Sequence, residues 1–189
     1  MNYPNWDLPK IDTNWTLFLD RDGVINYEKK DDYIRNKEEF RFYEGVPEAV
    51  ATCSRLFGKI FIVTNQRGIG KGLMTENDLL EIHQYMCQEI ASVGGKIDHI
   101  YYCTAINNND PNRKPNPGMA IQAKKDFPTI DFSKSIMVGN KPSDMLFGRN
   151  AGMYTVYVST THPETPFPHP DIDGRWISLP EFAKALMKS

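Results

Sequence analysis

The chain has 189 residues, a formal net charge of −2, a pI near 6.1 and a hydrophobic fraction of 40%. This charge argues against a nucleic-acid-binding protein, and no apolar run approaches the roughly 20 residues of a membrane helix. The N-terminus lacks the basic and apolar regions of a signal peptide. Three widely spaced cysteines suit reduced thiols, so we expect a cytoplasmic protein that is monomeric by default.

Short apolar runs alternate with stretches of helical spacing along the chain. Strands are predicted at residues 16–19, 60–63, 99–103, 135–138 and 154–158, with a weaker one at 175–178. Helices are predicted at residues 46–57, 75–92, 117–126, 143–151 and 180–188. Thr75 and Asp78 have the spacing of a capping box at the start of the second of these helices. The alternation predicts an α/β fold with a mainly parallel sheet.

Three segments fall outside this alternation within a single predicted domain, residues 1–189. Residues 1–14 are polar and are interpreted as an N-terminal arm. Residues 27–44 are charged and rich in aromatic side chains, and we expect a flap over the sheet, formed as a hairpin or as a loop excursion. Residues 162–170 contain four prolines and are interpreted as a connector.

The first predicted strand delivers two carboxylates, Asp20 and Asp22, followed at once by Gly23. Side chains two residues apart on a strand lean to the same face, so the two carboxylates would lie close together. One interpretation is a solvated Asp-Gly turn. The other is a site with a divalent cation, in which a carboxylate can also act as a nucleophile toward phosphorus.

Polar groups follow other strands in the same way. Thr64 and Asn65 end the second strand, Asn140 and Asp144 follow the fourth, and the pair Arg113-Lys114 precedes a helix. Ligands of open parallel sheets bind outside the carboxyl ends of the strands, so these groups would converge on one crevice. Carboxylates, a hydroxyl, a lysine and a divalent metal together are typical of a phosphate site.

Four segments in this order resemble the haloacid dehalogenase superfamily, over about residues 16–160. They are Phe18–Asn26, Val63–Gly70, Arg113–Met119 and Val138–Met145. Within this superfamily the segments resemble the histidinol-phosphatase-like branch, and the resemblance is strongest to phosphatases of heptose bisphosphate. The resemblance implies a three-layer Rossmann-like domain, here capless because the chain has no room for a helical cap.

The resemblance also implies roles for the quoted residues. Asp20 would be the nucleophile that becomes aspartyl-phosphate, Asp22 the general acid and then the general base, and Lys114 a stabiliser of the phosphorylated state. Thr64 and Asn65 would bind the phosphoryl group, and Arg113 would reach the substrate. Mg²⁺ would take a carboxylate oxygen of Asp20 and the carbonyl of Asp22.

The first of two departures from the family pattern lies at the metal. Asn140 stands where the family normally has an aspartate ligand. An amide oxygen can still bind Mg²⁺, but one negative charge is missing, so we expect weaker metal binding. Asp144 is a candidate to compensate, directly or through a water.

The second departure is the loss of zinc ligands. Related heptose phosphatases commonly carry a zinc loop at the position of residues 103–113. Here only Cys103 keeps a sulfur, and the following residues contain neither Cys nor His. Because structural zinc takes four ligands, we expect no zinc.

The leading hypothesis is a Mg²⁺-dependent phosphomonoesterase, with heptose bisphosphate as the best substrate. Histidinol phosphate and a polynucleotide end are alternative substrates, the latter disfavoured by the lack of a basic surplus. A further alternative is a weakly active, phosphate-binding regulatory protein, because Asn140 would weaken the metal site. His83 is interpreted as a surface or packing residue.

Overall fold

Six parallel strands form one sheet at the centre of the molecule, a computed structural model that describes residues 10–188. The strands are β1 (Thr16–Leu19), β2 (Lys59–Asn65), β3 (His99–Cys103), β4 (Ser135–Gly139), β5 (Tyr154–Val158) and β6 (Gly174–Trp176). Their order across the sheet is β3-β2-β1-β4-β5-β6. The chain order therefore reverses between β1 and β4, which is where doubly wound sheets bind their ligands. The expected parallel α/β sheet is confirmed.

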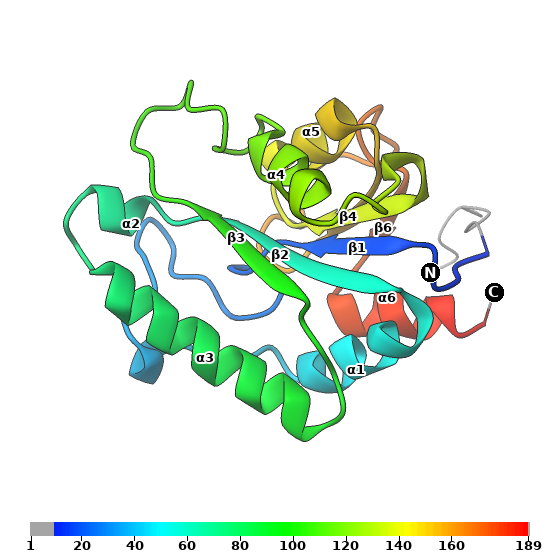
Figure 1. Cartoon of the computed structure of the whole chain (residues 1–189), viewed down its shortest axis with the longest axis horizontal. Helices are drawn as coiled ribbons and strands as arrows, with labels where there is room; N and C mark the ends of the chain where they lie inside the picture. The colour runs from blue at the N-terminus through cyan, green and yellow to red at the C-terminus, as the bar shows by residue number, and fades with distance from the viewer. Residues whose placement is uncertain (1–9, 189) are drawn as a thin grey trace.

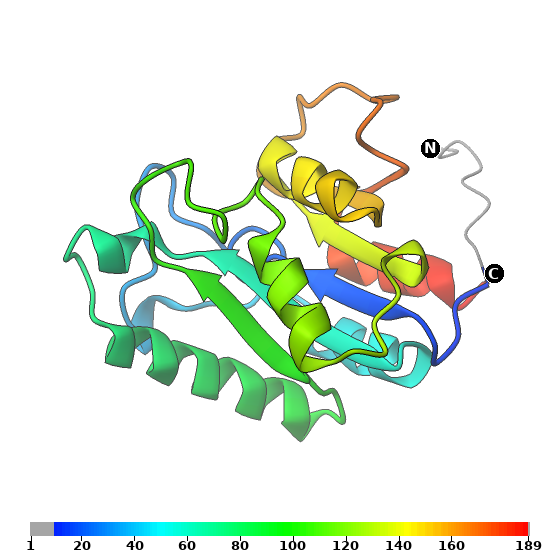
Figure 2. The ribbon, with the colours of Figure 1, turned by 45° about the horizontal axis from the view of Figure 1, so that its top comes forward.

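Helices cover both faces of the sheet and complete three layers (Figure 1). One face carries α1 (Val46–Leu56), α3 (Glu76–Ser92) and α6 (Leu179–Leu186). The other face carries α4 (Gly118–Asp126) and α5 (Pro142–Ala151) (Figure 2). Successive side chains of a strand point to opposite faces of the sheet. In β1, Leu17 and Leu19 therefore join the core under α1, while Phe18 joins the core under α4 and α5.

Local sequence signals account for where the helices begin. The side chain of Thr75 accepts from the backbone N–H of Asp78, whose carboxylate accepts in turn from Thr75, so α3 has the predicted capping box. The segment between β2 and α3 contains a short helix, α2 (Arg67–Gly70). Each predicted strand and long helix is present, with its ends shifted by no more than a few residues.

Residues 27–44 run over the sheet as a loop rather than a hairpin. The segment contains a short 3₁₀ turn, Lys37–Glu39, and one isolated antiparallel bridge joins Asn26 to Phe42. Its aromatic side chains pack on one another, and the rings of Tyr27 and Tyr43 are 4.0 Å apart. We call residues 27–44 the flap. Among residues 10–188 no helical cap domain is inserted, as expected.

The remaining segments add little regular structure. Residues 162–170 contain no helix or strand, and one isolated bridge joins His169 to Ile172. Most of the predicted N-terminal arm, residues 1–9, lies outside the described residues. Over residues 10–188, no helix combines the length and the apolar character needed to cross a bilayer.

Candidate active site

The predicted site residues meet where β1 and β4 end side by side. Leu19 pairs with Val138 across the two strands, and the backbone N–H of Asp20 donates to the carbonyl of Val138 at 3.0 Å. A cavity of about 480 Å³ opens above these strand ends. Seven of the predicted residues line it: Asp20, Asp22, Thr64, Asn65, Arg113, Lys114 and Asp144. Asn140 is fully buried beside them and does not line the cavity.

Lys114 is buried between two carboxylates at the floor of the cavity. Its Nζ lies 2.9 Å from Oδ1 of Asp20 and 2.7 Å from Oδ1 of Asp144. Burial alone would lower the pKa of Lys114, but the charges of Asp144 and Asp20 outweigh it and raise that pKa. Burial raises the pKa of Asp20 to about 6, against the opposing effect of Lys114. The lysine is therefore a permanent cation beside the predicted nucleophile.

Asp22 is held by donors on both of its carboxylate oxygens. Arg21 Nη2 donates to both oxygens at 2.8 Å, Asn26 donates to Oδ1 and Gln66 to Oδ2, each at 2.9 Å. Burial would raise the pKa of Asp22, but Arg21 and these hydrogen bonds lower it. The side chain of Asp22 is thus fixed as a carboxylate in this arrangement.

His83 of α3 lies behind this pair. The guanidinium of Arg21 is fully buried, and its Nη1 is 3.4 Å from Nε2 of His83. Because arginine only donates, Nε2 has to accept, which places the imidazole proton on Nδ1. Burial and the charge of Arg21 lower the pKa of His83 to about 3. Of the two roles considered for His83, surface residue or packing residue, the structure supports packing, and the side chain packs against the site.

The end of β2 contributes Thr64 and Asn65. Thr64 is 1% exposed, and its hydroxyl accepts from Gln66 Nε2 at 2.9 Å. The side chain of Asn65 makes two hydrogen bonds with the backbone of Lys114: Nδ2 donates to the carbonyl and Oδ1 accepts from the N–H, each at 3.1 Å. The structure therefore gives Asn65 a task in placing Lys114, and its contact with phosphate stays a prediction.

Three oxygens around the β1 and β4 ends are suited to a cation. Oδ1 of Asn140 is buried and accepts no hydrogen bond in the described part of the chain. Within residues 10–188, Oδ2 of Asp20 and the backbone carbonyl oxygen of Asp22 also accept no hydrogen bond. Carboxylate and carbonyl oxygens are the ligands that Mg²⁺ prefers, and a buried acceptor without a partner is costly. These residues fit a magnesium ion.

Asp144 is committed elsewhere. Its Oδ2 accepts from the backbone N–H groups of Asn140 and Lys141, at 3.1 and 3.0 Å, at the start of α5. Its Oδ1 contacts Lys114. A direct bond from Asp144 to a metal would have to displace one of these contacts. Within residues 10–188, no group of three or more Cys, His, Asp or Glu side chains is placed to hold a metal.

Two arginines organise the loop that leads to Lys114. Arg67 donates to the carbonyl of Ile106 at 2.9 Å and also contacts the side chain of Asn108. Arg113 donates to that same side-chain oxygen at 3.4 Å, and its position at the cavity wall suits the predicted contact with substrate. Cys103 lies at the start of this loop, 3.7 Å from Asp110.

Several site residues are absent from the sequence predictions. Arg21 and Gln66 stood inside the quoted motifs without a role. Their polar side chains, one residue from Asp22 and two from Thr64, are the signal that could have identified them. Thr161 contacts Asn140 from 21 residues further along the chain, and Thr160 donates to the carbonyl of Gly23, 137 residues before it, so no sequence spacing connects either pair. Glu28 of the flap pairs with Lys141 at 2.7 Å and ties the flap to the β4 end.

Comparisons with known proteins agree with this geometry. Residues 16–163 match the family described as polynucleotide kinase 3 phosphatase. D-glycero-beta-D-manno-heptose-1,7-bisphosphate 7-phosphatase of Helicobacter pylori is 35% identical over 178 residues, which cover 93% of this chain and 98% of that protein. D-glycero-alpha-D-manno-heptose-1,7-bisphosphate 7-phosphatase of Campylobacter jejuni is 41% identical over 74% of this chain and 79% of its own.

Solved structures are similar in fold. A D,D-heptose 1,7-bisphosphate phosphatase from B. bronchiseptica, complexed with magnesium and phosphate, has a TM-score of 0.84 at 24% identity and covers 92% of this chain and 98% of its own. The alignment with the Helicobacter pylori relative extends over nearly the whole of both proteins. The chain therefore belongs to the polynucleotide kinase 3 phosphatase family of the haloacid dehalogenase superfamily, together with the heptose-1,7-bisphosphate 7-phosphatases, and it is a phosphatase.

Proposed function

We propose that this protein is a Mg²⁺-dependent phosphomonoesterase that removes the 7-phosphate of a heptose 1,7-bisphosphate. The observation that carries the proposal is the buried Asp20 at the β1 end, with one oxygen on Lys114 and the other without a partner in the described residues, at the wall of the cavity. The similarity to heptose bisphosphate phosphatases supports the choice of substrate.

Asp20 is the nucleophile of the proposed reaction. Its Oδ1 accepts from Lys114 at 2.9 Å and from the backbone N–H of Arg21 at 2.8 Å, which leaves Oδ2 to form the bond to phosphorus. The bond from phosphorus to the sugar oxygen breaks as the aspartyl-phosphate forms. Lys114 offsets negative charge at the phosphoryl group, where a buried, fixed cation contributes more than a solvated one does.

Asp22 serves both proton transfers. It gives a proton to the leaving sugar oxygen, and as a carboxylate it later takes one from the water that hydrolyses the aspartyl-phosphate. The contacts with Arg21 and Gln66 favour the carboxylate, so the arrangement in the structure suits the second step. For the first step Asp22 has to leave these donors and carry a proton.

Asp20, the carbonyl of Asp22 and Asn140 would hold the magnesium ion. When bound, the ion supplies positive charge that draws the phosphate toward Asp20 and stabilises the charge of the transition state. The missing carboxylate at Asn140 leaves the site with fewer negative charges, so we propose that it needs higher metal concentrations than an all-carboxylate site.

The lining of the cavity suits a phosphorylated sugar. Most of the residues that line it are polar or charged, and besides Lys114 the cations among them are Lys29, Lys30, Arg67, Arg113 and Lys141. Interspersed acidic side chains, Glu28, Asp31 and Asp32, can accept hydrogen bonds from hydroxyl groups. A second phosphate and several hydroxyls match this mixture better than an apolar ligand does.

A substrate panel tests the proposal. Phosphate release is measured on both anomers of heptose 1,7-bisphosphate, on histidinol phosphate and on a 3′-phosphorylated oligonucleotide, with Asp20→Asn as the blank. We expect the highest kcat/KM on a heptose bisphosphate, by about tenfold or more, since losing one charged contact costs about that much. A higher value on either other substrate would overturn the substrate assignment, and release that persists in Asp20→Asn would overturn the mechanism.

We further propose a monomeric, cytoplasmic enzyme that binds neither nucleic acid nor membranes and carries no zinc. The near-neutral charge and the lone Cys103 in the loop before Lys114 support these points. Light scattering gives the mass in solution, and elemental analysis of the purified protein gives the zinc content. A stoichiometric zinc ion would contradict the proposal.

A further inference from the structure

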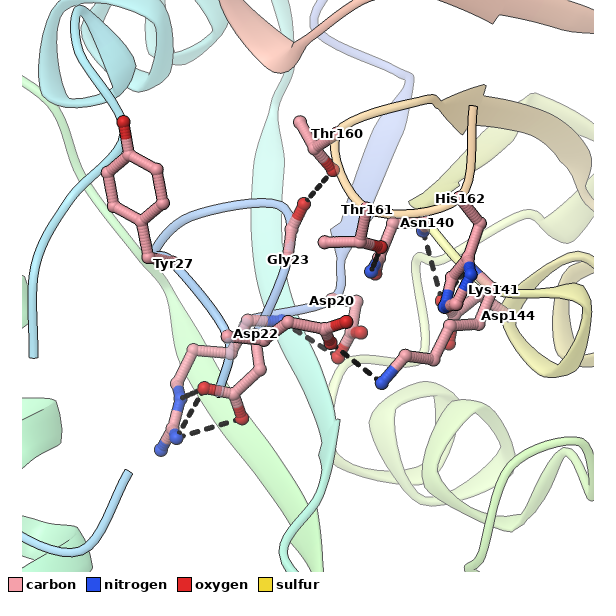
Figure 3. A network of polar contacts seen from close by, with 12 residues as sticks. Asp20, Asp22, Gly23, Tyr27, Asn140, Lys141, Asp144, Thr160, Thr161 and His162 are labelled. Carbon is pink, nitrogen blue, oxygen red and sulfur yellow. Dashed lines mark hydrogen bonds and ion pairs between the residues drawn. The ribbon is translucent and has the colours of Figure 1, made fainter. Parts of the chain in front are cut away.

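We propose that Thr161 is a positioning residue for the metal: its hydroxyl holds the amide of Asn140 so that the carbonyl oxygen, and not the NH₂ group, faces the cation. The inference rests on the magnesium site proposed above. Figure 3 shows the contact between Thr161 and Asn140, with Asp20 and Asp144 in the same network of polar residues.

The first step is the contact itself. Nδ2 of Asn140 donates to Oγ1 of Thr161 at 2.7 Å, and Asn140 is 0% exposed. An amide is planar and carries its oxygen and nitrogen on opposite sides of the terminal carbon, so the position of the nitrogen also sets that of the oxygen. The hydroxyl of Thr161 accepts here and would donate to the oxygen of a reversed amide, so the charge around the site has to select between the two orientations. Oδ1 is consequently the atom that remains buried without a hydrogen-bond partner in the described residues.

The second step is the lack of space around the amide. Gly23 lies against it so closely that an added Cβ would be 2.0 Å from Nδ2 and 2.9 Å from Oδ1 of Asn140. The hydroxyl of Thr160 donates to the carbonyl of Gly23 and holds that neighbour in place (Figure 3). Since β5 pairs with β4, the loop that follows β5 carries both threonines to the end of β4. Asn140 therefore has few orientations open to it.

The third step concerns charge. A reversed amide would aim its NH₂ donors toward the Asp20 side of the site and replace an attraction for the cation with a repulsion. A carboxylate at the same position has two equivalent oxygens and needs no partner to choose between them. The orienting role of Thr161 is thus a property of the amide, and the loss on removing its hydroxyl should be smaller when residue 140 is an aspartate.

The test is a double-mutant cycle read by metal binding. Isothermal titration with Mg²⁺, checked by Mn²⁺ titration followed by electron paramagnetic resonance, gives the dissociation constant of each variant without turnover. In the native background we expect Thr161→Val to raise the dissociation constant about tenfold, the usual effect of losing a group that orients a metal ligand. With Asn140→Asp already present, the same change should raise it less than about threefold.

Two further variants control the cycle. Thr161→Ser keeps the hydroxyl, and its metal affinity should stay within about twofold of the native value. Thr165→Val changes a threonine of the same loop that contacts Tyr157 instead, and it should leave the metal affinity unchanged. If Thr161→Val does not fold, Thr161→Ala in the two backgrounds supplies the same comparison.

Two outcomes overturn the inference: an equal loss in the native and Asn140→Asp backgrounds, or no loss in either. Failure of the proposed function looks different. If the substrate is wrong, the binding cycle is unaffected and only the substrate panel fails. If the metal is not at this site, Asp20→Asn will leave Mg²⁺ binding unchanged, which is measured in the same titrations.

Discussion

The ends of β1 and β4 face the same cavity but are built from different chemistry. The β1 end carries Asp20 and Asp22, and the buried cations Lys114 and Arg21 each pair with one of these carboxylates. At the β4 end the residue that we propose as a metal ligand is neutral Asn140, and Asp144 is occupied by Lys114 and by the start of α5. The β1 end is thus suited to perform the reaction, while the β4 end contributes orientation more than charge.

This difference shows how a site of this kind can lose a charge and keep its geometry. Asp20, Asp22 and Asp144 set three negative charges against the two positive charges of Arg21 and Lys114. An aspartate at position 140 would add a fourth negative charge to a buried cluster, which is costly whenever the metal is absent. Asn140 avoids that cost, and under our proposal it depends on its neighbours for orientation.

The largest expected effect comes from the nucleophile at the β1 end. Asp20→Asn should lower phosphatase turnover by about a thousandfold or more, because the amide cannot form the bond to phosphorus. Phosphate release under saturating substrate measures it. Asp126→Asn, an exposed change at the end of α4, is the control and should retain native turnover. Equal turnover of the native enzyme and Asp20→Asn would contradict the assignment of Asp20 as the nucleophile.

The ion pair behind the nucleophile should govern stability. Arg21→Met leaves the carboxylate of Asp22 without its main partner, and we expect a loss of about 3–5 kcal/mol in the free energy of unfolding, measured with urea. Adding Asp22→Asn should recover most of that loss, since the unpaired charge is gone. The control is Arg55→Met on the exposed surface of α1, with a change below about 0.5 kcal/mol. No recovery in the double variant would mean that packing, and not charge, sets the cost.

His83 should make the β1 end sensitive to acid. Its pKa is about 3 when folded and near 6.5 when unfolded, so the unfolded chain binds more protons between these values and stability falls as the pH falls. Between pH 7 and pH 5 the native protein should lose about 1–2 kcal/mol more than His83→Gln. The raised pKa of Asp20 acts in the opposite direction in both proteins and cancels in this difference. Urea unfolding at both pH values measures the difference. Exposed His99→Gln should behave as native, and identical slopes for all three proteins would contradict the burial of His83.

The smallest effect should come from making the β4 end resemble the β1 end. Asn140→Asp should tighten Mg²⁺ binding by about tenfold, and it should lower the unfolding midpoint measured without metal. Titration calorimetry and thermal unfolding with and without Mg²⁺ give both quantities. Gln88→Glu adds the same charge to the exposed side of α3 and should change neither. Unchanged affinity in Asn140→Asp would show that residue 140 is not a ligand.

The order of strands and helices was predictable because it depends on local patterns. Apolar runs such as residues 60–63 are long enough for buried strands, and the Thr75 capping box acts within three residues of the chain. The structure of the flap was ambiguous because it lacks such a local pattern. Its aromatic and charged residues have no period, so whether it forms a hairpin depends on what it packs against, and the structure shows a loop.

By itself, the sequence determined the fold class and the residues that gather at the strand ends, because the carboxyl ends of parallel strands always meet at one edge of the sheet. Only the tertiary structure decided how those residues divide the work. Asp22 is pinned by Arg21 and Gln66, Asp144 caps α5, and Thr161 reaches Asn140 from the loop after β5. Such contacts join residues far apart in the chain, and a hydrogen bond depends on fractions of an ångström that no residue spacing encodes.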